Sequence, residues 1–174
     1  ERPFIGGGQA NIVVDGADNS IVGGRNGYIS ASTYSTVTHG DRNKLYDSAT
    51  SSIGGNTNLI ISGTNSSIVS GDRNILYENN QSSFIGGGSE NLIYRRDTGG
   101  NVGFNVIGGG IQNTISGSVN TIVGGYDNEI TSDFYSGSTD LYSNSIIGAG
   151  WKNHILKSKN TSIVGGNNNY ISGS

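Results

Sequence analysis

A sequence motif repeated ten times constrains the fold of this chain more than any other feature. The motif has a small polar residue, Ile or Val two places on, then Gly, two free residues, an anchor that is Asn in all but one copy, one free residue and Ile or Leu. Residues 67–76 (SIVSGDRNIL) form one clean copy and residues 121–130 (TIVGGYDNEI) another. A period of this kind, kept from end to end, is typical of a solenoid. The anchor position of the copies is occupied by Asn11, Gly27, Asn43, Asn58, Asn74, Asn91, Asn113, Asn128, Asn153 and Asn169.

The repeats cover nearly all of the 174 residues, so we expect a single structural domain over residues 1–174. Glycine accounts for 30 residues, and glycine and asparagine both tolerate tight turns. The chain opens with Glu1, contains no Met, and begins and ends within a repeat. These features predict a segment of a longer protein.

Charge and composition exclude several classes of function. Ten Lys and Arg against thirteen Asp and Glu give a net charge of −3, whereas phosphate binding needs a basic field, so we expect no nucleic-acid partner. The absence of Cys excludes disulfides and thiolate metal sites. No apolar run approaches the ~20 residues of a membrane span, and we expect no membrane insertion.

The pattern within one repeat predicts two short strands. Ile and Val alternate with polar residues, as they prefer on a pleated surface, and Gly- and Asn-rich segments separate the strands. We therefore predict an all-β fold, a parallel β-solenoid (β-helix or β-roll) of about ten coils. At ~4.8 Å per coil such a rod is roughly 45 Å long. A β-hairpin sandwich would not explain why every copy keeps its anchor and its Ile in the same place.

Stacking the copies predicts two apolar core columns and a buried asparagine ladder at the anchor position. Two residues after the anchor lie Val13, Ile29, Leu45, Ile60, Leu76, Ile93, Ile115, Ile130, Ile155 and Ile171. Two residues after the small polar position lie Ile5, Val22, Val37, Ile53, Val69, Ile85, Ile107, Val123, Ile147 and Val164.

A third column predicts self-association. It precedes the column of Ile5 by one residue, so it faces the opposite side of the strand, and eight of its ten members are large and apolar. A soluble monomer does not normally expose such a stripe. We expect a homotrimer, side by side or intertwined, that buries it; cover by a neighbouring domain is the alternative. The column consists of Phe4, Ile21, Thr36, Ser52, Ile68, Phe84, Val106, Ile122, Ile146 and Ile163.

The repeats also resemble known proteins over nearly the whole chain, and one copy illustrates this. Residues 162–173 (SIVGGNNNYISG) resemble the Gly-rich head repeats of trimeric autotransporter adhesins and the related repeats of phage tail fibres and tailspikes. The resemblance implies a trimeric β-roll or β-helix in an extracellular surface fibre that recognises a host. The expected place is a virion or, alternatively, a bacterial cell surface. This chain departs from such heads in the length of its repeat, as from Asn58 to Asn74, and in having Ile or Leu where they have small Ala.

Two insertions interrupt the repeats, at Tyr94–Gly103 and Thr131–Tyr142. Both follow the second strand of a repeat, so we expect them to project side by side from one corner. Insertions in a solenoid often carry function, and aromatic rings beside charged groups suit a glycan. Surface decoration or subunit contact is the alternative. The candidate ligand-binding residues are Tyr94, Arg95, Arg96, Asp133, Phe134, Tyr135, Asp140, Tyr142 and Trp151.

Taken together, these patterns favour a structural and receptor-binding segment that attaches to a host polysaccharide or glycan. We expect no cofactor, no metal and no catalysis. A polysaccharide-degrading tailspike with an acid pair at Asp133 and Asp140 is the alternative. His39 and His154 are expected six coils apart, too far for a shared site. Arg25, Arg42 and Arg73, near Asp41 and Asp72, are predicted to be solvated turn charges.

Overall fold

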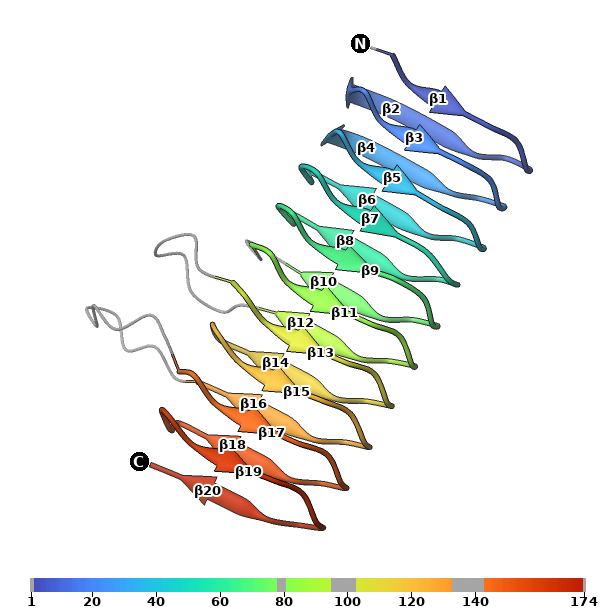
Figure 1. Ribbon diagram of the computed structural model, residues 1–174. Helices are drawn as coiled ribbons and strands as arrows, with labels where there is room; N and C mark the ends of the chain where they lie inside the picture. The colour runs from blue at the N-terminus through green and yellow to red at the C-terminus, as the bar shows by residue number, and fades with distance from the viewer. Residues whose placement is uncertain (1, 78–80, 95–102, 133–142, 174) are drawn as a thin grey trace.

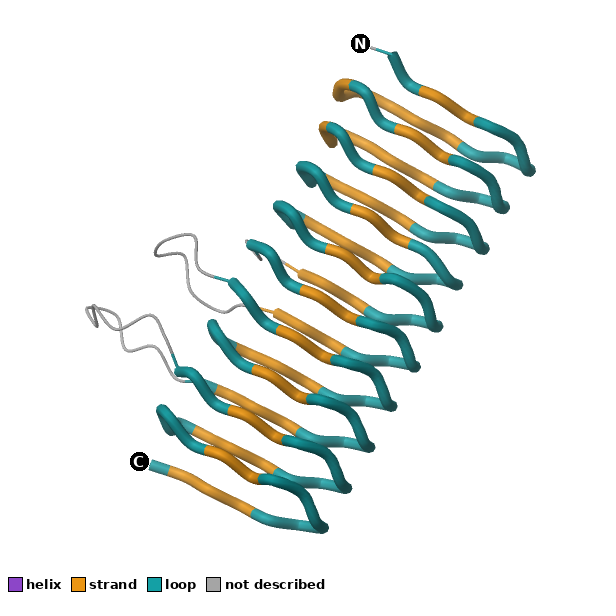
Figure 2. Tube along the Cα trace, in the orientation of Figure 1, coloured by secondary structure: helices purple, strands orange, loops and turns teal. Residues whose placement is uncertain are grey.

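A computed structural model describes residues 2–77, 81–94, 103–132 and 143–173, and every regular element in these ranges is a β-strand. The chain winds as a parallel β-solenoid of about nine turns (Figure 1), which confirms the predicted fold class. Strands alternate with turns along the whole rod (Figure 2). The part of the chain described here contains no helix long and apolar enough to cross a membrane.

Each repeat contributes one strand to each of two parallel sheets. The first sheet contains β1 (Phe4–Ile5), β3 (Ser20–Ile21), β5 (Thr36–Val37), β7 (Ser52–Ile53), β9 (Ser67–Ile68), β11 (Phe84–Ile85), β13 (Val106–Ile107), β15 (Thr121–Ile122), β17 (Ile146–Ile147) and β19 (Ser162–Ile163). The second contains β2 (Ile12–Ala17), β4 (Tyr28–Thr33), β6 (Lys44–Tyr46), β8 (Leu59–Ile61), β10 (Ile75–Tyr77), β12 (Leu92–Tyr94), β14 (Thr114–Ser116), β16 (Glu129–Thr131), β18 (His154–Leu156) and β20 (Tyr170–Ser172).

The core is a narrow double row of aliphatic side chains between the two sheets. The row from the second sheet is the predicted one: from Ile29 to Ile155 its members are fully buried, and Val13 and Ile171 are partly buried at the ends. The row from the first sheet consists of Ile21, Val37, Ile53, Ile68, Ile85, Ile107, Ile122, Ile147 and Ile163. Each coil therefore buries only two large side chains.

The predicted first-sheet column is wrong at four positions. Val22, Val69, Val123 and Val164 are all more than half exposed. In each case the Ile that precedes the Val is buried instead, and the strand register pairs that Ile with the core residues of adjacent coils. Since the side-chain period of a strand is two, this one-residue difference moves the side chain to the other face.

The same shift removes the continuous apolar stripe on which the homotrimer was predicted. The outward column of the first sheet consists of Phe4, Ser20, Thr36, Ser52, Ser67, Phe84, Val106, Thr121, Ile146 and Ser162. Six of its members are Ser or Thr. Hydroxyl groups partner one another along part of it, as between Ser20 and Thr36 at 3.0 Å.

The anchor asparagines form the predicted buried ladder. The Asn74 N–H donates to Oδ1 of Asn58 in the preceding coil at 2.8 Å, and the Asn91 N–H donates to Oδ1 of Asn74 at 3.0 Å. The Nδ2 group of Asn91 donates to the carbonyl oxygens of Gly87 and Gly110, within its own turn and in the next one. The ladder thus provides hydrogen-bond partners for buried backbone N–H and C=O groups that strand pairing does not pair.

A second ladder, which the sequence analysis did not predict, runs along the opposite corner. The Ser35 N–H donates to Oδ1 of Asn19 at 3.0 Å, and the Asn120 N–H donates to Oδ1 of Asn105 at 3.1 Å. Its members lie two residues before a first-sheet core residue, as each anchor lies two before a second-sheet core residue. One coil therefore has the same kind of hydrogen-bonded ladder position at both of its corners.

Left-handed backbone makes both corners possible. The residue directly before a ladder position has a positive φ, for example 55° at Arg42 and 61° at Val119. In the turns from the first to the second sheet, a glycine three residues before the anchor also has a positive φ, such as 109° at Gly40. A Cβ at Gly40 would overlap the carbonyl oxygen of Gly55 in the next coil, so only glycine fits there.

Candidate functional site

The turns that lead from the first sheet to the second form one long edge of the rod, at the right in Figure 1. Two residues before each anchor, this edge carries a column of backbone-bridged residues, which we call the turn column. Each member is bridged to the same position of the next coil, so the column is as regular as a strand. Its members are Gln9, Arg25, Asp41, Asn56, Asp72, Ser89, Ile111, Tyr126, Trp151 and Asn167.

The first half of the turn column is ionic. The Arg25 guanidinium donates to both carboxylate oxygens of Asp41, at 3.1 and 3.0 Å, and Arg42 lies 3.4 Å from the same carboxylate. Arg73 pairs with Asp72 at 3.1 Å and with Glu90 at 3.3 Å. The arginine side chains are 56–60% exposed. The structure therefore confirms the predicted turn charges beside Asp41 and Asp72.

These ion pairs change the titration of Asp41. The pKa of the Asp41 carboxyl lies below its ordinary value, chiefly because the Arg25 side chain donates hydrogen bonds to it. The charged form of the carboxylate is favoured by those donors. The pair is open to solvent, so its effect is on local charge more than on the stability of the fold.

The second half of the turn column is apolar and aromatic. Ile111, Tyr126 and Trp151 follow one another in three successive coils and are 47%, 41% and 50% exposed. The rings of Tyr126 and Trp151 are 6.3 Å apart at an interplanar angle of 66°, an edge-to-face arrangement. The ammonium group of Lys152 lies 5.6 Å from the Trp151 ring. We call Ile111, Tyr126 and Trp151 the aromatic edge.

The backbone below the aromatic edge is firmly held. The Tyr126 N–H donates to the carbonyl of Gly150, and the Trp151 N–H donates to the carbonyl of Gly166, each at 2.9 Å. The Lys152 N–H donates back to the carbonyl of Tyr126 at 3.0 Å. Since these bonds fix the spacing of successive coils, the two rings keep their separation without help from a ligand.

Polar side chains accompany the aromatic edge in the neighbouring column. Gln112, Asp127, Lys152 and Asn168 each follow a turn-column residue directly. Gln112 is oriented by a hydrogen bond from its Nε2 to Glu90, at 2.8 Å. The site thus combines two partly exposed rings with amide, carboxylate and ammonium groups, a combination that can bind a ligand having both apolar faces and hydroxyl groups.

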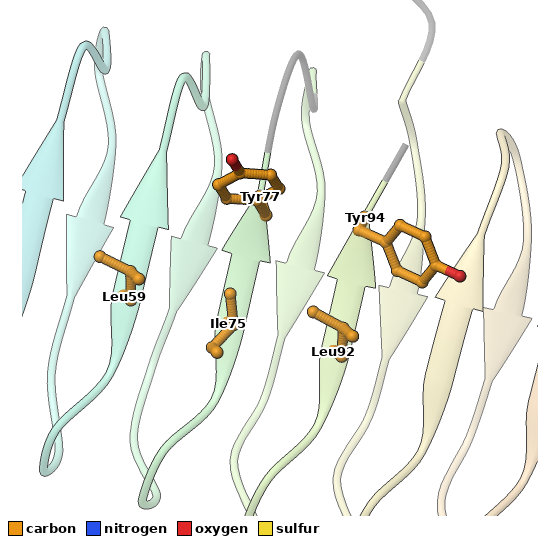
Figure 3. Close-up of a pocket in the computed structure, with 5 residues that line it drawn as sticks. All are labelled: Leu59, Ile75, Tyr77, Leu92 and Tyr94. Carbon is orange, nitrogen blue, oxygen red and sulfur yellow. The ribbon is translucent and has the colours of Figure 1, made fainter. Parts of the chain in front are cut away.

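A second surface feature lies on the outer face of the second sheet. Leu59, Ile75, Tyr77, Leu92 and Tyr94 surround an apolar hollow of about 430 Å³ (Figure 3). These side chains come from the neighbouring strands β8, β10 and β12 and lie on the same side of the sheet. Among the described residues, only these aliphatic and tyrosine side chains line the hollow.

Two of the nine predicted ligand-binding residues are described, and the structure does not bring them together. Tyr94 ends β12 and lines the hollow, whereas Trp151 belongs to the turn column three coils further on. Arg95, Arg96, Asp133, Phe134, Tyr135, Asp140 and Tyr142 lie outside the described residues. The chain passes into both insertions from the second sheet, at the edge opposite the turn column. Trp151 is therefore not on the edge from which the insertions leave.

Sequence reasoning missed Tyr126 and Ile111 as neighbours of Trp151. The signal is present, because all three lie two residues before an anchor asparagine. The residues three after the anchor form a further column, in which Tyr46 and Tyr77 are separated by Ile61 and Tyr77 is followed by Tyr94.

The described residues offer no grouping of three His, Asp or Glu side chains that would hold a metal ion. His39 and His154 lie six coils apart, as predicted. The Nδ1 atom of His154 lies 3.2 Å from Glu129 on the adjacent strand. The proposed acid pair at Asp133 and Asp140 lies outside the described residues.

Comparison of the sequence with models of protein families finds no match, and comparison with curated proteins finds none either.

Proposed function

We propose that this chain is a rigid, rod-like segment of a viral attachment fibre or spike, and that it binds a host-surface glycan at the aromatic edge. The observation that carries the proposal is the exposed Tyr126–Trp151 pair on a hydrogen-bonded corner of the rod. The resemblance of the repeats to those of surface fibres supports the biological setting.

Trp and Tyr are the side chains expected at such a contact. They provide a large rigid surface at little cost in conformational entropy, and they dominate the binding energy of many interfaces. A sugar ring has an apolar face that can stack on an aromatic ring and hydroxyl groups that need donors and acceptors. Asp127, Lys152 and Asn167 supply these beside the two rings.

The spacing of successive coils also indicates how long a ligand the aromatic edge can contact. Ile111, Tyr126 and Trp151 rise by one strand spacing each, so the edge spans roughly 10 Å along the rod. This length exceeds a single sugar ring and suits a short run of linked sugar units. We therefore expect an oligosaccharide to bind more tightly than any monosaccharide. Binding without cleavage of the glycan is what we propose.

The test is binding of the purified chain to an array of bacterial and other surface glycans. Trp151→Ala and Tyr126→Ala should each lower retention at least roughly ten-fold, as loss of an aromatic anchor does. The matched control is Tyr34→Asn, which removes a tyrosine that is 63% exposed on the opposite edge. Asn accepts the positive φ of that position.

Three outcomes would overturn the proposal. If the Tyr34 variant loses as much retention on the glycan array as the Trp151 variant does, the binding is nonspecific adhesion. Undiminished retention by Trp151→Ala would place the ligand elsewhere. Shortening of the glycan during incubation would favour the polysaccharide-degrading alternative.

A further inference from the structure

The side chains on the outer face of the second sheet stand in regular columns along the rod. This face is built from two columns, one and three residues after the anchors, which we call the inner-turn and outer-turn columns. The inner-turn column is Ile12, Tyr28, Lys44, Leu59, Ile75, Leu92, Thr114, Glu129, His154 and Tyr170. The outer-turn column is Val14, Ser30, Tyr46, Ile61, Tyr77, Tyr94, Ser116, Thr131, Leu156 and Ser172.

The middle of this face is apolar. Leu59, Ile75 and Leu92 are adjacent in the inner-turn column, and Tyr77 and Tyr94 stand beside them to form the hollow of Figure 3. A contiguous apolar patch on the surface of a rod indicates an interaction site. The patch extends over three adjacent strands of a regular sheet, and this repeating surface suits another sheet better than a small ligand.

Only two residues of this face carry a full charge among those that the structure describes, Lys44 and Glu129. Both belong to the inner-turn column. Lys44 is exposed on β6, and no described carboxylate forms an ion pair with it. Glu129 on β16 is 36% exposed, and its carboxylate also contacts His154 Nδ1 and accepts a hydrogen bond from Thr131.

The two charges are placed symmetrically about the apolar centre. In the order of the second sheet, β8 and β10 follow β6 on one side, and β14 and β12 precede β16 on the other. The midpoint between Lys44 and Glu129 therefore falls between β10 and β12, beside Ile75 and Leu92. A two-fold rotation about an axis along the strands at this point would exchange the levels of Lys44 and Glu129.

We propose that two copies of this chain pack face to face through their second sheets, with their rods antiparallel, about this two-fold axis. Such an axis keeps each column opposite the same column of the other copy. Lys44 then meets Glu129 of the partner subunit, and the reverse contact forms as well. Ile75 meets Leu92 of the partner subunit, so the apolar centres cover each other, as an isologous interface requires.

Charge distinguishes this arrangement from parallel packing. Copies related by an axis along the rod, as in the trimer expected from the sequence, bring equal levels together. The Lys44 side chains would then gather at one level and the Glu129 side chains at another, and like charges across an interface are costly. The antiparallel order replaces both repulsions with two opposite-charge contacts.

The test is a charge exchange followed by sedimentation equilibrium. The wild-type chain should sediment at about twice its mass of 18.0 kDa. Lys44→Glu alone and Glu129→Lys alone should each weaken association at least roughly ten-fold, because either change creates two like-charge contacts per pair. An equimolar mixture of the two variants should associate again, because both contacts of the mixed pair then join a Glu of one copy to a Lys of the other. The double variant carrying both exchanges should dimerise as the wild type does, since its two contacts are again between opposite charges.

Apolar variants provide the second measurement. Ile75→Ser should yield monomers, whereas Ile146→Ser, which alters a side chain 46% exposed on the first sheet, should leave the mass unchanged. Thermal unfolding of each variant verifies that it is folded. A wild-type monomer, a mass of three chains, or a double variant that stays dissociated would each overturn the proposal.

Discussion

The main-chain N–H of Asn128 and its side-chain Nδ2 both donate to Oδ1 of Asn113, at 3.1 and 3.0 Å. One side-chain oxygen thus serves two donors of the next coil. The same relationship recurs between Asn91 and Asn113 and between Asn128 and Asn153. Each of these asparagines therefore completes the hydrogen bonding of the coil that follows it.

Removal of one ladder side chain should destabilise the rod strongly. Asn113→Ala leaves the buried N–H of Asn128 without its acceptor and also frees the carbonyl of Gly109, which accepts from Asn113 at 3.1 Å. We expect the free energy of unfolding to fall by about 2–4 kcal/mol, measured by urea denaturation. Asn167→Ala, at an exposed turn position, should change it by less than about 0.5 kcal/mol. Equal losses would contradict a special role for the ladder.

The one glycine in the anchor column offers the converse experiment. The Gly27 N–H donates to Asn11 Oδ1 at 2.9 Å, as an anchor does, but Gly27 has no side chain to serve the next coil. A Cβ there would lie 3.0 Å from Asn11 Oδ1, a contact that a small shift of the Asn11 amide relieves, and 3.4 Å from Ile21, which is close to an ordinary van der Waals contact. Gly27→Asn should therefore raise stability by about 1 kcal/mol, through the added hydrogen bonds and a less flexible unfolded chain.

Thermal unfolding measures this change. A gain of about 1 kcal/mol should raise the Tm by roughly 2–4 °C in a chain of this size. Gly27→Ala is the control, because it restricts the unfolded chain without adding the amide. A rise of the same size in both variants would show that the ladder contributes nothing at this coil.

The register of the first sheet can be tested with one adjacent pair. Ile68 is fully buried, whereas Val69 is 53% exposed. Ile68→Ala should cost about 2–5 kcal/mol of unfolding free energy, as other large core truncations do, and Val69→Ala less than about 0.5 kcal/mol. Urea denaturation of the two variants measures both losses of unfolding free energy. A larger loss in Val69→Ala than in Ile68→Ala would support the register expected from the sequence.

The register of the first sheet also shows how much of the core could be predicted from the sequence. The second-sheet column was correct because it was counted from the anchor, whose place in the coil is constant. The first-sheet column was counted from the small polar residue, whose place shifts: Ser20 directly precedes the buried Ile21, whereas Ser51 lies two residues before the buried Ile53. Counting back six positions from the anchor finds Ile21, Ile68 and Ile122, and only the shortened turn after Ile53 departs from it.

The candidate site was predicted only in part for a related reason. Trp151 stood out as the only tryptophan, but its partner Tyr126 lies on the other side of the second insertion in the sequence. Only the pairing of successive turns brings the two rings together. The insertions can be recognised in the sequence because they break the period, whereas the aromatic edge keeps the period and differs from the other turns only in residue type.

The ion pair between Arg25 and Asp41 predicts a pH dependence. A carboxyl with a lowered pKa in the folded state adds stability above the ordinary aspartate pKa of about 3.9, and this contribution is lost as the pH falls through the lowered value. In Arg25→Gln the pKa of Asp41 should rise toward its ordinary value, because the hydrogen bonds from Arg25 are the main cause of the shift.

A carbon-detected NMR titration of the Asp41 carboxyl measures that change. Arg73→Gln is the matched control, since Arg73 pairs with Asp72 and Glu90 and should leave Asp41 unaffected. An Asp41 titration that is the same in the Arg25 variant as in the wild type would show that the exposed pair is too dynamic to influence the carboxyl.

The corner that receives both insertions tolerates large changes in chain length. The segments from Asn91 to Asn113 and from Asn128 to Asn153 are both much longer than the segment from Asn58 to Asn74, and yet β12, β14, β16 and β18 stay in register. The fold is held by the ladders and the double row of aliphatic side chains, none of which lies in the added segments. This corner is therefore a natural grafting point, where foreign peptides could be displayed at fixed heights along a rod without redesign of the scaffold.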